Sequence, residues 1–321
     1  MGFKYAVVSP TMGWIGHNVM ETPREIMAAV AEAGYDGIDV PGEPKQMDGK
    51  EWRKMAEEAG LEVPEVLAAW AFHHAGEERY LTSLDSAVRA CGIQYAKDTV
   101  ELAAEIGARF VELCTAQTTV PQVPYPLDPI SEMRKHFKES ICEICDHAKQ
   151  YDVTILLEPL NCYEGLPGVL TTVHEAVSYV EELKRDNLGV QPDNFHMNIS
   201  ESSIVGALRR ARGHIKHYHF NESNRAMHGT GHSPFKEIVR TLKDINYDGY
   251  IAMYMPLTTQ RIFQSAPGAA MYGTRSAESI GESDDSRTLL EYVSQPIQLV
   301  KEIERLVDAE RAYYEIESPR Y

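Results

Sequence analysis

The chain lacks a long apolar run, an excess of positive charge and a dense set of cysteines. No stretch approaches 18 consecutive apolar residues, and no basic segment followed by an apolar run opens the sequence, so neither a membrane-spanning helix nor a signal peptide is predicted. The 48 Asp and Glu residues outnumber the 31 Lys and Arg residues and give a net charge of -17, which repels phosphate backbones and anionic membranes. We therefore expect a cytoplasmic protein with no nucleic-acid and no membrane partner.

Five cysteines in 321 residues do not make a disulfide framework. Cys142 and Cys145 have the C-x-x-C spacing of redox and metal-binding motifs, but they lie inside a long helical pattern with no strand directly before it. Two thiols three residues apart on a helix are usually packing residues, and this interpretation is favoured here.

The sequence also has no Pro/Ser/Gly-rich linker and no internal repeat, so we expect a single domain over residues 1–321. Short β-rich runs alternate with amphipathic helical runs, which is typical of parallel βαβ units. The expected strands are Tyr5–Ser9, Gly37–Val40, Val63–Ala68, Phe110–Cys114, Thr154–Glu158, Leu188–Asp193, His214–His219 and Tyr250–Tyr254. The expected helices are Pro23–Ala33, Glu51–Ala59, Ser83–Ile106, Pro129–Gln150, Thr172–Leu183, Ser203–Ala211, Ser233–Ile245 and Asp285–Val307. This α/β pattern favours a closed (β/α)₈ TIM barrel over a doubly wound sheet, the alternative.

The run from 256 to 287 is longer than an ordinary βα loop. It follows the eighth expected strand, so a TIM barrel would place this insertion at the catalytic face. Its Tyr, Phe, Met and Ile residues favour an ordered lid or partner-binding surface over a disordered insertion. The residues after Val307 are expected to be peripheral.

Three polar motifs lie at the ends of strands five, six and seven. They contain Glu158 in TILLEPLNCYE, Asp193 in LGVQPDNFHMNISE and His219 in IKHYHFNESNR. Because the carboxyl ends of barrel strands converge, we expect these side chains at one point, as oxygen and imidazole ligands for Mn²⁺, Mg²⁺ or Co²⁺. Alone, such a Glu is usually a surface or capping group and such a His is usually a hydrogen-bonded core residue. Their joint occurrence supports the metal-site hypothesis.

The motifs ILLEPLN-x-YE, D-N-FHMNI-x-E and H-x-H-x-x-E-S-N-R…G-T-GH resemble those of the ketose 3-epimerases, of the tagatose/allulose type, within the xylose-isomerase-like barrel superfamily. The resemblance covers roughly Gly37 to Met255. It implies that one divalent metal ion, Mn²⁺ above all, is bound by Glu158, Asp193 and His219. It also implies that Glu158 is the catalytic base.

The same resemblance implies that the substrate's hydroxyl and carbonyl oxygens are held by Glu164, His196 and Arg225. Trp14, on the loop after strand one, is expected either to pack on a sugar face or to be an ordinary loop aromatic.

Ketose 3-epimerases carry a fourth metal ligand, a glutamate at the end of strand eight, and here the chain departs from the family. The segment YDGYIAMYMPL puts Tyr254 at that place. Epimerisation at C3 normally uses a carboxylate on each face of the carbon, and a phenol is a poor base near pH 7 because its reference pKa is about 10.

Three outcomes of this replacement remain open. A residue of the insertion, such as Gln260, Glu278 or Glu282, replaces the glutamate. The reaction uses a single face of the substrate, as in aldose–ketose isomerisation or β-elimination. Or the chain is non-catalytic.

The main hypothesis is a metal-dependent sugar isomerase or epimerase that abstracts a proton next to a carbonyl through a metal-stabilised enediolate. The alternative is a metal-dependent lyase that resembles the large subunit of bacterial C-glycoside deglycosidases. Such enzymes eliminate an aglycone from a 3-oxo-glycoside together with a small β-rich partner subunit. We expect a homo-oligomer in the first case and a hetero-oligomer with that subunit in the second.

Overall fold

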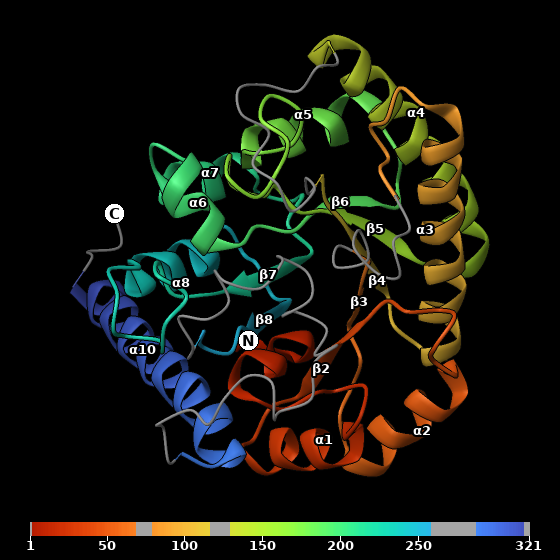
Figure 1. Cartoon of the computed structure of the whole chain (residues 1–321). Coiled ribbons are helices and arrows are strands. Elements are labelled where there is room, and N and C mark those ends of the chain that lie inside the picture. The colour runs from red at the N-terminus through yellow and green to blue at the C-terminus, as the bar shows by residue number, and fades with distance from the viewer. Residues whose placement is uncertain (1, 69–78, 116–128, 258–286, 318–321) are drawn as a thin grey trace.

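The computed structural model is a ring of parallel β-strands with helices packed outside it (Figure 1), and it describes residues 2–68, 79–115, 129–257 and 287–317. The strands are β1 Lys4–Val8, β2 Gly37–Pro41, β3 Glu65–Leu67, β4 Phe110–Leu113, β5 Thr154–Leu157, β6 Leu188–Val190, β7 His217–Phe220 and β8 Tyr250–Met253. The α-helices are α1 Pro23–Glu32, α2 Gly49–Ala59, α3 Ser86–Ile106, α4 Ile130–Ala148, α5 Val173–Leu183, α6 Asn194–Ser200, α7 Ile204–Arg210, α8 Phe235–Asp244 and α10 Leu289–Glu317. Two short 3₁₀ helices are η1 Ser9–Ile15 and η3 Lys149–Tyr151.

The strand order runs β6-β5-β4-β3-β2-β1-β8-β7, and every neighbouring pair is parallel. Two single bridges, Val190 to Ile215 and Asp193 to His219, join the ends of this order. The sheet therefore returns on itself, which confirms the predicted TIM barrel and excludes the doubly wound sheet.

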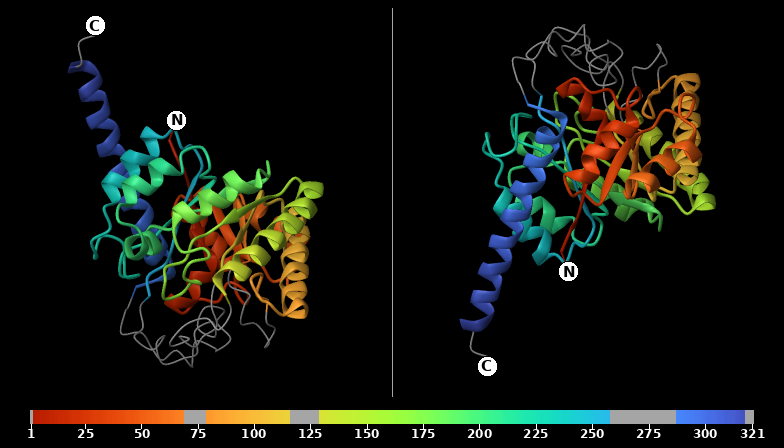
Figure 2. Two further views of the ribbon diagram at one scale, coloured as in Figure 1. Left: turned by 90° about the horizontal axis from the view of Figure 1, so that it is seen from above. Right: turned by 90° about the horizontal axis from the view of Figure 1, so that it is seen from below.

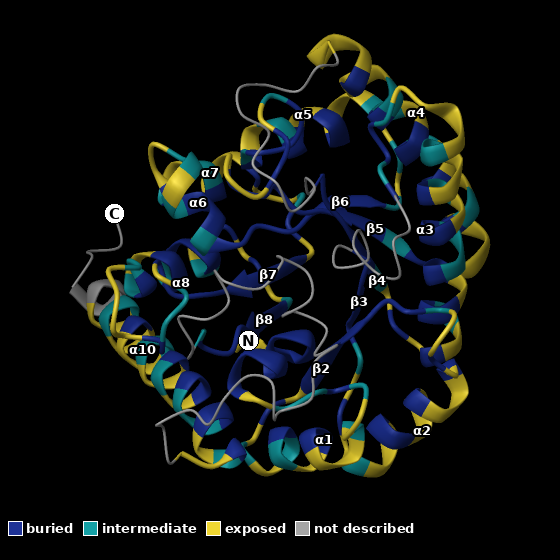
Figure 3. Cartoon of the chain, viewed as in Figure 1, coloured by how far each residue is buried: buried dark blue, intermediate teal, exposed yellow. Residues whose placement is uncertain are grey.

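Burial explains why the strands are almost continuously apolar in sequence. The ring is covered by helices, and all residues of β2, β3, β7 and β8 are buried, whereas each helix exposes its outer face (Figure 3). A polar side chain inside such a strand is costly unless it is paired. Polar residues that do face the barrel interior therefore need a specific explanation.

Two short helices were not expected from the sequence. The 3₁₀ helix η1 directly follows β1, and the helix α6 begins where a strand was expected to extend to Asp193. Asp193 instead caps α6, because its Oδ1 accepts a hydrogen bond from Phe195 N at 2.7 Å. Asp193, which the sequence pattern placed at the end of a strand, is therefore the N-cap of a helix.

The last helix is longer than predicted. The expected helix stops at Val307, but α10 continues to Glu317, and its far end stands away from the barrel (Figure 2). Cys142 and Cys145 lie in α4 as free cysteines, so the predicted packing interpretation of the C-x-x-C pair agrees with the structure.

The expected insertion falls almost entirely on residues 258–286, including Gln260, Glu278 and Glu282, and lies outside the described residues. Its role therefore stays a prediction, as does the single-domain boundary at 1–321. No helix in the described ranges is both long and apolar enough to cross a membrane.

The packing of α4 against the barrel predicts a large loss of stability when it is disrupted. Phe137 is fully buried and meets the ring of Tyr179 edge-on at 5.4 Å. We expect Phe137→Ala to lower the free energy of unfolding by about 3–5 kcal/mol, measured by urea denaturation. Tyr163, whose side chain is 83% exposed, is the matched aromatic control, and Tyr163→Ala should change that free energy by about 0.5 kcal/mol or less. Equal losses in both variants would contradict this account of the core.

Candidate active site

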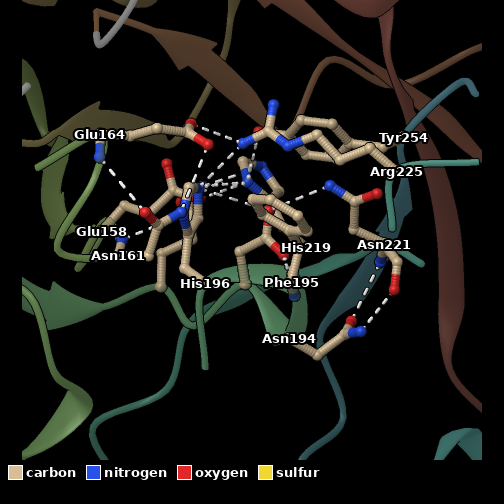
Figure 4. Close-up of polar contacts among 12 residues, drawn as sticks. Glu158, Asn161, Glu164, Asn194, Phe195, His196, His219, Asn221, Arg225 and Tyr254 are labelled. Atoms are coloured by element: carbon tan, nitrogen blue, oxygen red, sulfur yellow. Dashed lines mark hydrogen bonds and ion pairs between the residues drawn. The ribbon is translucent and has the colours of Figure 1, made fainter. Parts of the chain in front are cut away.

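Polar side chains meet at the carboxyl ends of β5 to β8 (Figure 4). Glu158 follows β5, Asp193 follows β6, His219 lies in β7 and Tyr254 follows β8. All four are at most 2% exposed. The strand ends of a TIM barrel thus bring together residues that are far apart in the sequence, as predicted.

The predicted metal ligands lie close to one another. The Nδ1 atom of His219 is 3.1 Å from Oε1 of Glu158, and the backbone of His219 forms the closing bridge with Asp193. Two groups of potential ligand atoms, each within 4.8 Å, occur among the described residues. Glu158 and Asp193 belong to one group with His196, and His219 belongs to the other. Because His219 also contacts Glu158, it lies between the two groups.

The surroundings of His219 indicate which nitrogen can bind an ion. Its Nε2 lies 3.2 Å from Oε2 of Glu65 and 2.8 Å from the side-chain amide of Gln191. The carboxylate of Glu65 can accept a hydrogen bond from a proton carried on Nε2. In this tautomer Nδ1 has a lone pair that can serve as a ligand once an ion replaces the proton that His219 otherwise shares with Glu158.

His196, although close to Glu158 and Asp193, is better suited to donate a hydrogen bond. The backbone N–H of Asn161 donates to Nδ1 of His196 at 3.0 Å. A neutral imidazole that accepts at Nδ1 carries its proton on Nε2, so this nitrogen has no lone pair for a metal ion. The geometry therefore favours the predicted role of His196 as a donor to a substrate oxygen.

Arg225 is held over the site by three side chains. Its Nη2 donates to Oε2 of Glu164 at 2.7 Å, and its guanidinium lies 4.1 Å from the ring centroid of Phe195 and 5.3 Å from that of Trp14. Trp14 belongs to η1 and is only 2% exposed, so it forms part of the wall of the site. The predicted substrate-binding residues are thus neighbours in space.

Tyr254 occupies the place at the end of strand eight that the sequence assigned to it. Its hydroxyl lies 3.3 Å from Nδ1 of His219, and its ring centroid lies 5.8 Å from that of Trp14. Burial and the nearby carboxylates of Glu158 and Asp193 raise the pKa of the phenol well above its ordinary value. Tyr254 therefore stays protonated and contributes a neutral hydroxyl rather than a carboxylate.

Glu158 lies beside Glu112, a second buried carboxyl from β4. Burial and the negative charge of Glu158 raise the pKa of Glu112 well above its ordinary value. Burial also opposes ionisation of Glu158, but the neighbouring Glu112 carboxyl and the imidazole of His219 outweigh it and lower the pKa of Glu158 to about 2. Glu158 is therefore the ionised partner of the pair, which is the state that a metal ligand or a base requires.

Several residues of the site were missed by the sequence reasoning. Asn161 accepts from the N–H of Glu164 at 3.2 Å through Oδ1, besides donating to His196, and Phe195 stacks on Arg225. Both lie within the quoted motifs but carried no stated role. The sequence did contain an indication of Glu112, because this charged residue interrupts the apolar run of a predicted strand in RFVELC.

The model of the xylose isomerase-like TIM barrel family matches residues 27–272 of this chain. The chain belongs to this family. Among curated members, a D-psicose 3-epimerase of Agrobacterium fabrum is 31% identical over 70% of this chain and 76% of its own length. A ketose 3-epimerase of Arthrobacter globiformis is 30% identical over 74% of this chain and 78% of its own length.

A solved family structure agrees in fold. A D-psicose 3-epimerase crystallised in the presence of D-fructose superimposes with a TM-score of 0.77 at 25% identity, covering 94% of this chain and 99% of that one. The predicted resemblance to the ketose 3-epimerases and the predicted enzyme class, a sugar isomerase or epimerase, are confirmed by these relatives.

Asn161 is hydrogen-bonded to two residues of the predicted substrate-binding set, His196 and Glu164, and to none of the predicted metal ligands. We expect Asn161→Ala to lower kcat/KM about ten- to thirtyfold, as one or two lost hydrogen bonds imply, and to leave the metal content unchanged. Asn187 is the matched control, because its amide donates to Cys145 O and Val153 O away from the site. Metal loss in Asn161→Ala, with normal kinetics after reloading, would contradict this role.

Proposed function

We propose that this protein is a divalent-metal-dependent sugar isomerase or epimerase that abstracts a proton next to a carbonyl group. The observation that carries the proposal is the meeting of Glu158, Asp193 and His219 beside the cationic clamp of Arg225. A small polyhydroxylated carbonyl compound fits this combination of ligand atoms, hydrogen-bond donors and aromatic walls.

The donor set of Glu158, Asp193 and His219 suits a hard or borderline ion, and Mn²⁺ is our first choice, with Mg²⁺ and Co²⁺ as alternatives. When bound, such an ion would supply Lewis-acid stabilisation of negative charge that develops on a carbonyl oxygen. Asp193 is suited to this role because its Oδ2 has, among the described amides, a single long contact, 3.5 Å from Nδ2 of Asn221, while Oδ1 caps α6.

The remaining residues would orient the sugar. The Nε2–H of His196 and the guanidinium of Arg225 donate to carbonyl and hydroxyl oxygens, while Glu164 accepts from a hydroxyl. Trp14 and Phe195 offer apolar faces to the C–H groups of the ring or chain. Donors fixed before the substrate arrives lower the barrier because they need not reorganise as negative charge develops.

Proton transfer would use Glu158 as the base. Glu158 is ionised, and its neighbour Glu112 is protonated, so one proton is shared within the pair. The phenol of Tyr254, also protonated, can donate a hydrogen bond but is a poor base. One ionised carboxylate on one face favours reactions in which the proton leaves and returns on the same side, such as aldose–ketose isomerisation.

Deuterium exchange tests the proposed function directly. The Mn²⁺-loaded protein is incubated in D₂O with D-fructose, D-psicose or L-ribulose, and deuterium at the carbon next to the carbonyl is followed by NMR. We expect incorporation with the native chain and none with Glu158→Gln. The absence of exchange with every sugar by the fully loaded native protein would contradict the proposal.

A second candidate, elimination from a 3-oxo-glycoside as in C-glycoside deglycosidases, is favoured by one observation. Tyr254 provides a neutral proton donor in place of a second base, and elimination needs one base and one donor to the leaving group. Release of an aglycone from a 3-oxo-C-glycoside, with copurification of a small β-rich subunit, would select this candidate.

The replacement at strand eight also predicts a gain of function. We expect Tyr254→Glu to raise C3-epimerase activity at least tenfold, because a second carboxylate would then face the base across the substrate, as the resemblance to the ketose 3-epimerases implies. Tyr254→Phe is the matched variant, which removes the hydroxyl and keeps the ring against Trp14. If Tyr254→Phe gained epimerase activity equally, the missing carboxylate would not be what limits the native chain.

A further inference from the structure

A second group of ionisable side chains lies deeper in the barrel than the proposed catalytic ion. It consists of Asp39 from β2, Glu65 from β3 and His217 and His219 from β7, and one ligand atom of each lies within 4.8 Å of the others. All four side chains are fully buried. Such a group differs from a surface acidic cluster because water cannot compensate its charges.

The spacing of its atoms matches that of ligands around a small ion. The Nε2 of His217 lies 2.9 Å from Oδ2 of Asp39 and 3.7 Å from Oε2 of Glu65, which lies 3.2 Å from Nε2 of His219. Metal–ligand distances of about 2.0–2.1 Å in a tetrahedral site place neighbouring ligands about 3.3 Å apart. The two distances from Nε2 of His217, 2.9 Å to Asp39 and 3.7 Å to Glu65, fall on either side of this value.

Several acceptor atoms of the group have no hydrogen-bond donor among the described residues. They include Oδ1 of Asp39 and Oε1 of Glu65. A buried carboxylate oxygen without a donor is costly unless a cation or a proton lies beside it. Asp39 and Glu65 therefore each keep a buried oxygen that a cation could bind.

The shared residue His219 links this group to the catalytic ion. If Nδ1 of His219 binds the first ion beside Glu158, its only remaining donor is the N–H at Nε2, which faces Glu65 at 3.2 Å. His219 then contributes no lone pair to the deeper group, and the ligands left there are Asp39, Glu65 and His217. Imidazole and carboxylate ligands together suit Mn²⁺, Fe²⁺, Co²⁺ or Zn²⁺.

We propose that the barrel interior holds a second divalent transition-metal ion, bound by Asp39, Glu65 and His217 beneath the catalytic ion. Glu65 connects the two sites. It accepts a hydrogen bond from His219, which binds the first ion, and Glu65 itself binds the second ion. This inference depends on the proposed function only because His219 belongs to both sites. The number of ions bound per chain distinguishes the second site from the catalytic one.

The test uses Mn²⁺ as the probe on the full chain. Protein stripped by a chelator is reloaded with Mn²⁺, desalted and analysed for metal per chain. We expect two equivalents in the native protein and about one in Asp39→Asn, which alters the deeper group without touching His219. Glu158→Gln should also hold about one. Glu304→Gln, a carboxylate of α10 outside the barrel that accepts from Lys243, is the control and should hold two.

Each result decides between the sites. One equivalent in the native protein that is lost in Glu158→Gln overturns the second site and leaves the proposed function intact. One equivalent lost in Asp39→Asn but kept in Glu158→Gln supports the deeper site and contradicts the catalytic one. Two equivalents kept in Asp39→Asn overturn the proposed ligands. If Asp39→Asn fails to fold, anomalous diffraction at the Mn edge from the native protein decides by the number and position of the peaks.

Discussion

The register of the closing strands is the constraint on which the whole site depends. The bridge between Asp193 and His219 closes the ring, and β7 pairs with β8 so that His219 stands beside Ala252. A shift of one residue in β7 would turn His219 outward and point its neighbours into the barrel, because successive side chains of a strand face opposite sides. The same hydrogen bonds that complete the fold therefore assemble the ligands.

The cost of burying charge is the second constraint, and it explains how the polar residues are arranged. Five carboxyl groups, those of Asp39, Glu65, Glu112, Glu158 and Asp193, are buried in the barrel with the imidazoles of His217 and His219. Isolated ions in such surroundings would be strongly destabilising. Sharing a proton between neighbouring carboxyls, pairing with imidazoles and binding cations are the available ways to offset this cost. A barrel that retains so many ionisable groups in its interior is organised for chemistry rather than for stability alone.

The sequence predicted most of the fold, because the buried parallel strands are short apolar runs separated by clear helical patterns. Seven of the eight strands start within two residues of the expected position. The exception is β7, which begins at His217 rather than His214. The helix α6 was missed because it has only seven residues and its N-cap, Asp193, also has the position of a strand end in the sequence pattern. The three motifs likewise gave the residues at the mouth of the barrel, and the structure places these residues together.

The deeper layer could not be predicted in the same way. Asp39, Glu65 and His217 lie on three strands and meet only when the register of each is known, and Asp39 and Glu65 lie in none of the quoted motifs. Tyr254 is an intermediate case. The sequence showed that a carboxylate is missing there, but only the structure shows that the phenol reaches His219. Motifs at strand ends are readable from sequence because the barrel topology makes them converge, whereas contacts across the interior depend on side-chain geometry.

The most direct test of the account is whether the three mouth residues share one catalytic ion. Isothermal titration with Mn²⁺ on Glu158→Gln, Asp193→Asn and His219→Ala should show that each loses the same binding event and that ketose turnover is lost with it. Glu164→Gln, which alters the same pocket without a predicted ligand, should keep that event. If the three variants bound Mn²⁺ and turned over substrate like the native protein, the metal-centred account would be contradicted.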